Sequence, residues 1–208
     1  MISEIDSMKL INRLRAFTLI ELLVVISIIA ILASLALPAI TGALTRGQAS
    51  QTMSNARQLY VATFNMAADG QTTGDTNLCW PGDSSSANWS TWATGLTTGG
   101  YLSTNDFNKM LNAQGVSRPA NTVPTAATPS ALSVYKVKDS SPMQSIFVSS
   151  ANFVTPGTAL VSTALPFGNK AFVVMRRGGD GLVYQGAQAT NTTLFFDTVY
   201  TVLDDKLQ

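Results

Sequence analysis

An apolar segment, Phe17–Leu44, constrains this chain more than any other feature of its sequence. Glu21 is the one charged side chain in it, and Leu22–Leu44 contains no charge. At about 1.5 Å per helical residue, this length can cross a bilayer core of about 30 Å. A carboxylate in such a segment costs about 2.5–3.5 kcal/mol at the helix centre and less near an interface. Glu21 therefore needs a function that offsets this cost.

The stretch of chain before the apolar segment is short, and its last part is basic. Lys9, Arg13 and Arg15 lie just ahead of it. Because positive charge near a membrane helix stays in the cytoplasm, we expect a cytoplasmic N-terminus and a translocated C-terminal part. Met8 is an alternative start, which would leave a leader, Met8–Ala16, that contains no acidic residue.

The order of residues around the start of the apolar segment is specific. A basic leader ends at Ala16 and is followed by Phe17-Thr18-Leu19-Ile20-Glu21-Leu22. This arrangement resembles the class III leader of type IV pilins and type II secretion pseudopilins. The resemblance implies that a prepilin peptidase cuts between Ala16 and Phe17 on the cytoplasmic side and that Phe17 is N-methylated. The family usually has Gly before the cut, and Ala16 is small enough to replace it.

Glu21 follows Phe17 by four residues, so the two side chains are expected on one helix face. After cleavage, Phe17 would carry an α-amine with a pKa of about 7.7–8.0, which a carboxylate can neutralise. The resemblance implies that the favoured partner is the amine of a neighbouring subunit, and that this pairing sets the stagger of a filament. The alternative is a single-pass anchor with an interfacial Glu21.

Pro38 and Gly42 interrupt the expected helix. Proline removes a backbone donor and kinks or loosens a helix, and glycine weakens it further. The resemblance implies a point where the helix partly melts on assembly. The alternative is a tolerated membrane proline.

Residues 45–69 are expected to form the amphipathic half of the same helix, which would run from Phe17 to Ala68 and stop at Gly70. The apolar positions recur at three- and four-residue spacing, and they are Ala49, Met53, Ala56, Tyr60, Phe64 and Ala67, with Leu59 and Met66 beside them. The polar side of this helix, which is expected to face solvent, consists of Arg46, Gln48, Gln51, Asn55 and Gln58.

Residues 70–208 are predicted to form one β-rich head. Residues 70–100 are expected to be a loop, and Ser103 or Thr104 is expected to cap a short helix that Gly115 ends. The glycine-rich turn 178–181 predicts a hairpin. Apolar runs predict strands at Leu132–Val137, Ser145–Ser149, Ala159–Thr163, Ala171–Arg176, Leu182–Gln185 and Thr193–Leu203. The predicted fold class is α+β and pilin-like: a long N-terminal helix packed against a small antiparallel sheet.

The residue types present argue against an enzyme. The chain has no histidine, so the commonest general base and metal ligand is missing. Cys79 is its one cysteine, and the net charge of +1 gives no basic field for nucleic acid. No cofactor is expected. Asp180 is the calcium candidate in the head, together with Asp197, Asp204 and Asp205, but their spacing does not fit an EF-hand.

The sequence therefore predicts a structural subunit in four parts: a leader (1–16), a transmembrane or filament-core helix (17–44), an amphipathic half (45–69) and a periplasmic or extracellular head (70–208). Its expected location is the bacterial inner membrane, with the head in the periplasm, before it enters a filament of like subunits. Its expected partners are a prepilin peptidase, an inner-membrane assembly platform and other pilin-like subunits. A secretion pseudopilin is favoured, and a surface pilus for adhesion, motility or DNA uptake stays open. A membrane-anchored binding module, which could bind glycan through Trp80, Trp89 and Trp92, is the alternative.

Overall fold

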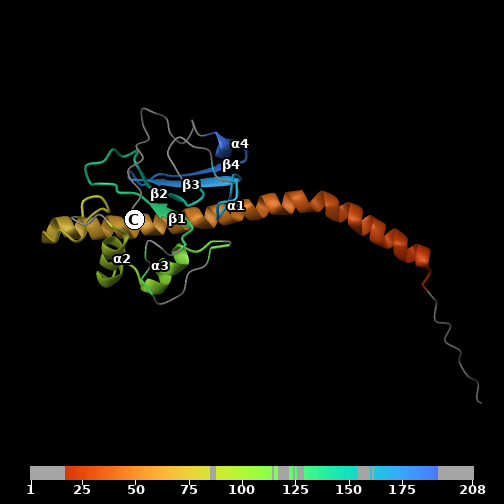
Figure 1. Ribbon diagram of the computed structural model, residues 1–208, viewed down its shortest axis with the longest axis horizontal. Helices are drawn as coiled ribbons and strands as arrows, with labels where there is room; N and C mark the ends of the chain where they lie inside the picture. The colour runs from red at the N-terminus through yellow and green to blue at the C-terminus, as the bar shows by residue number, and fades with distance from the viewer. Residues whose placement is uncertain are drawn as a thin grey trace, which may run out of the picture. The chain divides into compact units, whose positions relative to one another are not determined.

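The computed structural model describes residues 17–84, 88–113, 115–116, 122–123, 125, 129–153, 160 and 162–191. The chain divides into two compact units, Met1–Gly42 and Ala43–Gln208. Each unit is described by itself below. In Figure 1, the second unit holds the sheet and the short helices together with the later part of the long helix α1.

Helix α1 (Leu19–Thr73) contributes its later part to the second unit. The buried positions follow alternating three- and four-residue steps, which is the pattern of one apolar stripe. They include Ala49, Thr52, Ala56, Leu59, Thr63, Met66 and Gly70.

Three predictions about α1 were wrong. Asn55 was predicted on the polar side, but it is buried, and its amide is satisfied there by donating to the carbonyl of Met110 at 3.2 Å. Phe64 was placed in the buried stripe, but it is exposed. Gly70 was expected to stop the helix, but the helix continues and Gly74 follows its end with a φ of 74°. Gly70 is glycine for a different reason, since a Cβ there would lie 1.7 Å from the carbonyl oxygen of Leu78.

Four strands form an antiparallel sheet in the order β1-β2-β3-β4. Their bounds are Leu132–Val134, Ile146–Ser150, Ala171–Arg176 and Gly181–Gln185. Each was predicted to within a few residues, and the hairpin turn between β3 and β4 is confirmed. The strand predicted at Ala159–Thr163 is not formed by its described residues, because Ser162 and Thr163 lie in turns that lead to Phe167, which packs against Ala49. Ala159 and Val161 lie outside the described residues. The strand predicted at Thr193–Leu203 lies outside the described residues.

Strand β3 lies inside the sheet, between β2 and β4, and is buried on both faces over most of its length. Val173 packs with Ala49 of α1, whereas the ring of Phe172 lies 5.5 Å from the ring of Phe153. On the neighbouring strand β2, the register shifts between Ile146 and Val148, so Phe147 is an extra residue in a β-bulge.

Three short helices complete the described fold. Helix α2 (Trp89–Thr98) corrects the prediction of a loop over residues 70–100. Its first turn is capped by Asn88, whose side chain accepts from the N–H of Thr91 at 2.8 Å. Helix α3 (Thr104–Met110) is capped by Ser103 as predicted but ends before Gly115, and α4 is Ala187–Thr190.

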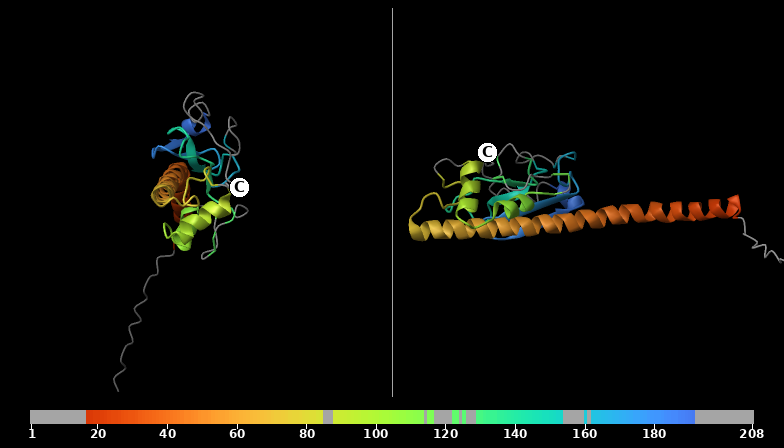
Figure 2. Two further views of the ribbon diagram at one scale, coloured as in Figure 1. Left: turned by 90° about the vertical axis from the view of Figure 1, so that its left-hand side faces the viewer. Right: turned by 90° about the horizontal axis from the view of Figure 1, so that it is seen from below.

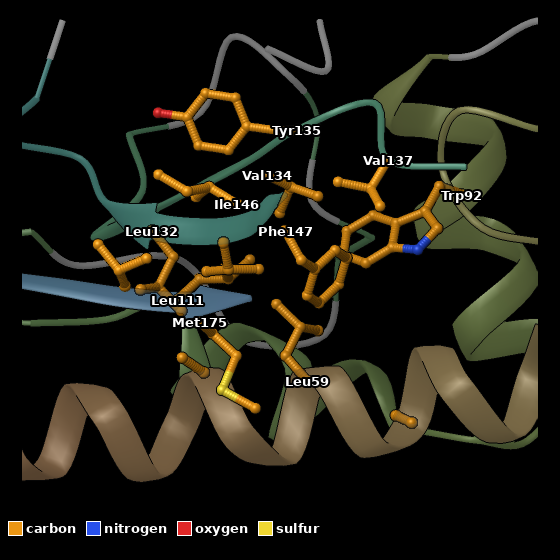
Figure 3. Close-up of a cluster of buried hydrophobic side chains, with 14 of the residues drawn as sticks. Leu59, Trp92, Leu111, Leu132, Val134, Tyr135, Val137, Ile146, Phe147 and Met175 are labelled. Atoms are coloured by element: carbon orange, nitrogen blue, oxygen red, sulfur yellow. The ribbon is translucent and has the colours of Figure 1, made fainter. Parts of the chain in front are cut away.

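The core joins all these elements within the second unit. In Figure 2, the strands lie along one side of the later part of α1, and α2 and α3 lie along another. Figure 3 shows Leu59 rising from α1 towards Phe147 of the bulge, with Trp92 of α2 beside them. The rings of Trp92 and Phe147 are 6.3 Å apart and meet edge to face. The long N-terminal helix and the small antiparallel sheet give the predicted α+β, pilin-like architecture.

Candidate assembly site at the start of the apolar helix

The apolar part of α1 leaves its side chains uncovered. From Phe17 to Ile40, the large apolar side chains are 46–81% exposed. Helix α1 is long and apolar enough to cross a membrane. A surface of this kind is stable only against lipid or against other apolar helices.

The polar side chains inside this segment are satisfied by the helix itself. The hydroxyl of Ser27 donates to the carbonyl of Leu23 at 2.7 Å, and that of Ser34 donates to Ile31 at 2.8 Å. Thr41 donates to the carbonyl of Pro38 at 3.0 Å. Because no donor in this set needs water, the segment suits an apolar environment along its length.

Thr18 and Glu21 form a reciprocal cap at the start of α1. The carboxylate of Glu21 accepts from the backbone N–H of Thr18 at 2.9 Å and from its hydroxyl at 2.7 Å. In return, the hydroxyl of Thr18 accepts from the N–H of Glu21 at 3.3 Å. This arrangement is a capping box, which satisfies two N–H groups that a helix start otherwise leaves unpaired. Sequence analysis missed it, although Thr-x-x-Glu before an apolar run is its signal.

Phe17 lies just before the helix rather than in its first turn. The expected alignment of Phe17 with Glu21 on one helix face is therefore not formed in the uncleaved chain. The ring of Phe17 is exposed. Ala16, the other residue of the predicted cleavage site, lies outside the described residues.

Pro38 and Gly42 both lie inside α1. Because Pro38 has no N–H, the carbonyl of Ser34 lacks its usual helical donor. A Cβ at Gly42 would meet nothing within 4 Å, so no packing within the chain requires glycine there.

The head offers little support for a glycan or calcium site. Trp80, Trp89 and Trp92 are only 3–4% exposed, so none presents a ring face on which a sugar could stack. The carboxylate of Asp180 is paired with Arg176 at 3.1 Å across the hairpin turn. Among the described residues, no group of three acidic, cysteine or histidine side chains could hold a metal ion. Asp197, Asp204 and Asp205 lie outside those residues.

Cys79, beside the buried Trp80, is half-buried. Burial and then the nearby carboxylates of Asp83 and Asp75 raise the pKa of its thiol. The thiol is therefore a weak nucleophile at neutral pH.

Comparison with known proteins decides what the N-terminal arrangement is. A family model described as the prokaryotic N-terminal methylation motif matches residues 11–37. The chain carries the type IV pilin-like prepilin leader signature. No curated protein and no solved structure matches the chain.

The described part of the match, residues 17–37, lies in the segment whose large apolar side chains are exposed. It includes Thr18 and Glu21 and ends one residue before Pro38. The head lies outside it, so the pilin-like character of the head rests on the α+β architecture alone.

Proposed function

We propose that this chain is a structural subunit of a type IV pilus-like filament, and that it acts as a type II secretion pseudopilin in protein export. The observation that carries the proposal is the methylation motif at residues 11–37, which lies over an exposed apolar helix with one carboxylate at its start. An ordinary anchor explains the apolar helix but gives no role to the motif or to Glu21.

In this proposal, a prepilin peptidase cleaves between Ala16 and Phe17, and the new amine of Phe17 is methylated. Cleavage creates a cation on Phe17, the residue directly before Thr18 of the capping pair of Thr18 and Glu21. The carboxylate of Glu21 then has a charged partner available, either in its own chain or in a neighbouring subunit. Among apolar helices, a paired carboxylate and amine are far less costly than either charge alone, because their mutual attraction offsets part of the desolvation penalty.

Before assembly, the chain would sit in the inner membrane with its N-terminus in the cytoplasm and its head in the periplasm. An assembly platform in the same membrane would then transfer it to the filament. Pro38 and Gly42 would allow the helix to loosen locally during that transfer.

Two features favour a secretion pseudopilin over a surface pilin. The chain has a single cysteine, so its head has no internal disulfide to resist shear outside the cell. The described sheet has only four short strands. Deleting the protein separates the two functions: a pseudopilin is needed for protein export, whereas a surface pilin is needed for adhesion, motility or DNA uptake.

The first test is the mass of the N-terminal peptide in protein extracted from membranes. We expect a mature start at N-methylated Phe17, and an intact leader in matched cells that lack the prepilin peptidase. An intact leader in cells with an active peptidase would contradict the proposal and favour an anchored module.

The second test is the substitution Glu21→Ala. A filament subunit should be processed and inserted but fail to assemble, because the carboxylate is the charged partner of the amine. A simple anchor should tolerate the change, since removing a charge from an apolar segment is favourable. The matched control is Ser27→Ala, which removes a polar side chain that bonds only to its own helix.

A further inference from the structure

The later part of α1 has an exposed face opposite its buried stripe. Arg57, Val61 and Phe64 follow each other at four- and three-residue steps on it, and we call these three residues the outer face. Val61 is 49% exposed and Phe64 is 51% exposed. Within the described residues, Arg57 has no carboxylate partner. The outer face therefore combines uncovered apolar surface with an unpaired cation.

A groove of about 490 Å³ lies where α1 ends, between α1 and the loops around residues 74–83 and 139–140. The accessible apolar part of its lining includes the half-buried Leu78 and Cys79, and its acidic residues are Asp75, Asp83 and Asp139. Gly70 near the end of α1 and Gly74 just after it line the groove without side chains that would fill it.

The three acidic residues of the groove are not equivalent. Asp139 is already neutralised by Arg177, whose guanidinium lies 2.6 Å from its carboxylate. Among the described residues, Asp83 accepts one hydrogen bond, from the backbone N–H of Asp139 at 2.7 Å, and Asp75 accepts from Asn77. In the described part of the chain, neither Asp75 nor Asp83 has a cationic partner.

We infer that the outer face of one copy docks in the groove of the next copy, with Arg57 against Asp83 and Asp75 and with Val61 and Phe64 against the apolar lining. This inference rests on the proposed filament function and names the contact between successive heads. A second copy is the occupant because the two surfaces are complementary in charge and both have apolar area to cover.

The geometry of this contact also fits an open-ended assembly. The two surfaces are different parts of the same molecule, so the contact is heterologous. A heterologous contact leaves one free surface at each end, and each free surface accepts a further copy. A contact between two identical surfaces would instead close as a dimer.

The native thiol gives a direct test, because Cys79 lines the groove and is the one cysteine of the chain. In full-length protein carrying Val61→Cys, oxidation of freshly prepared membranes at alkaline pH, where the Cys79 thiol ionises, should link successive copies into a ladder of dimers, trimers and larger species. Adding Cys79→Ser should abolish the ladder. Lys109→Cys, on the exposed side of α3, is the matched control and should give no ladder.

Two results would overturn the inference. One is a yield of linked species from Val61→Cys no higher than from Lys109→Cys. The other is a product that stops at dimers and persists without Cys79, because it would show that two outer faces meet symmetrically.

A charge exchange tests the same contact without new thiols. Arg57→Asp and Asp83→Arg should each lower filament yield by about tenfold, because an attractive pair becomes repulsive. The double variant should recover to within about twofold of wild type, since the pair is restored with reversed sign. Lys109→Glu is the control for a surface charge reversal away from the contact.

The outcomes also separate this inference from the proposed function. If wild type assembles and Arg57→Asp assembles equally well, the contact is wrong and the filament function stands. If both single variants fail and the double variant does not recover, the pairing is wrong. If processed wild-type protein never enters a filament, the proposed function fails and this inference fails with it.

Discussion

The side-chain amide of Asn55 donates to the backbone carbonyl of Met110 at 3.2 Å and so ties α1 to the end of α3. The amide oxygen of Asn55 accepts from Gln51 at 3.0 Å, so both ends of this buried side chain have partners. We expect Asn55→Leu to lower the free energy of unfolding by about 2 kcal/mol, because it leaves the Met110 carbonyl without this donor. Chemical denaturation of the full chain in detergent micelles measures the change.

The control for Asn55 is Gln58→Leu, one turn along α1. The Gln58 amide makes only a surface contact of 3.5 Å with Ser54, so its removal should change the free energy of unfolding by less than about 0.5 kcal/mol. Equal effects from both variants would show that the bond to Met110 contributes nothing to stability.

The reciprocal cap of Thr18 and Glu21 should hold the first turn of α1 in the uncleaved chain. Thr18→Ala removes the hydroxyl that both donates to and accepts from Glu21, and loss of such a cap costs about 1 kcal/mol. Hydrogen exchange of the first-turn amides in micelles should therefore speed up about fivefold. Thr18→Ser keeps the hydroxyl and should exchange like wild type. Equal exchange in all three proteins would contradict the cap.

Much of the head could be predicted from local patterns. The β3 run Ala171–Arg176 is apolar on both faces, which predicts a central strand, and the glycines after it predict the hairpin. Helix α2 was missed because serine, threonine and glycine have poor helix propensity. Trp89, Trp92 and Leu96 do carry a helical spacing, and their burial, together with the Asn88 cap, holds the helix.

Other features were not visible because they depend on contacts distant in sequence. Asn55 looks like a surface residue until α3 brings the carbonyl of Met110 against it. The bulge at Phe147 depends on how β2 pairs with β3, which no local pattern specifies. At the candidate site, the leader motif and Glu21 could be identified from sequence. The reciprocal hydrogen bonds between Thr18 and Glu21 are seen only in the structure.

Substitution by alanine should have opposite effects on stability at two glycines of α1. A Cβ at Gly47 meets nothing within 4 Å, so Gly47→Ala should stabilise the helix by about 1 kcal/mol through higher helix propensity. A Cβ at Gly70 would lie 1.7 Å from the carbonyl oxygen of Leu78, so Gly70→Ala must displace the backbone after the helix. We expect Gly70→Ala to lower the melting temperature of the full chain in micelles and Gly47→Ala to raise it. The opposite order would contradict the placement of the 74–84 loop on α1.

The stability of the head should be insensitive to pH in the neutral range. The chain has no histidine, which is the side chain that ordinarily titrates between about pH 5 and 8. Burial raises the pKa of the Cys79 thiol, so this group stays protonated there as well. Denaturation midpoints of the full chain should therefore agree across this range, and a clear transition within it would reveal a titrating group that the described residues do not account for.

At alkaline pH, Tyr135 should make stability fall. Burial raises the pKa of this phenol in the folded chain above the ordinary value of about 10, although its hydrogen bond to Ser149 acts in the opposite direction. Below about pH 10 the phenol is protonated in both states, and its contribution is fully present. Above that pH the unfolded chain loses the proton more readily, so stability falls by up to about 1.4 kcal/mol per pH unit until the folded pKa is passed.

The substitution Tyr135→Phe tests this sign. At alkaline pH, the unfolding free energy of this variant should fall less steeply with pH than that of wild type. The difference in slope is the contribution of one proton, because phenylalanine has no group that titrates. Tyr101→Phe is the control: the phenol of Tyr101 is more exposed, and its pKa is raised mainly by the hydrogen bond to Asp69. Solvent screens that bond, so the alkaline slope of this variant should stay close to wild type. A slope that does not change in Tyr135→Phe would show that Tyr135 ionises as easily in the folded chain as in the unfolded one.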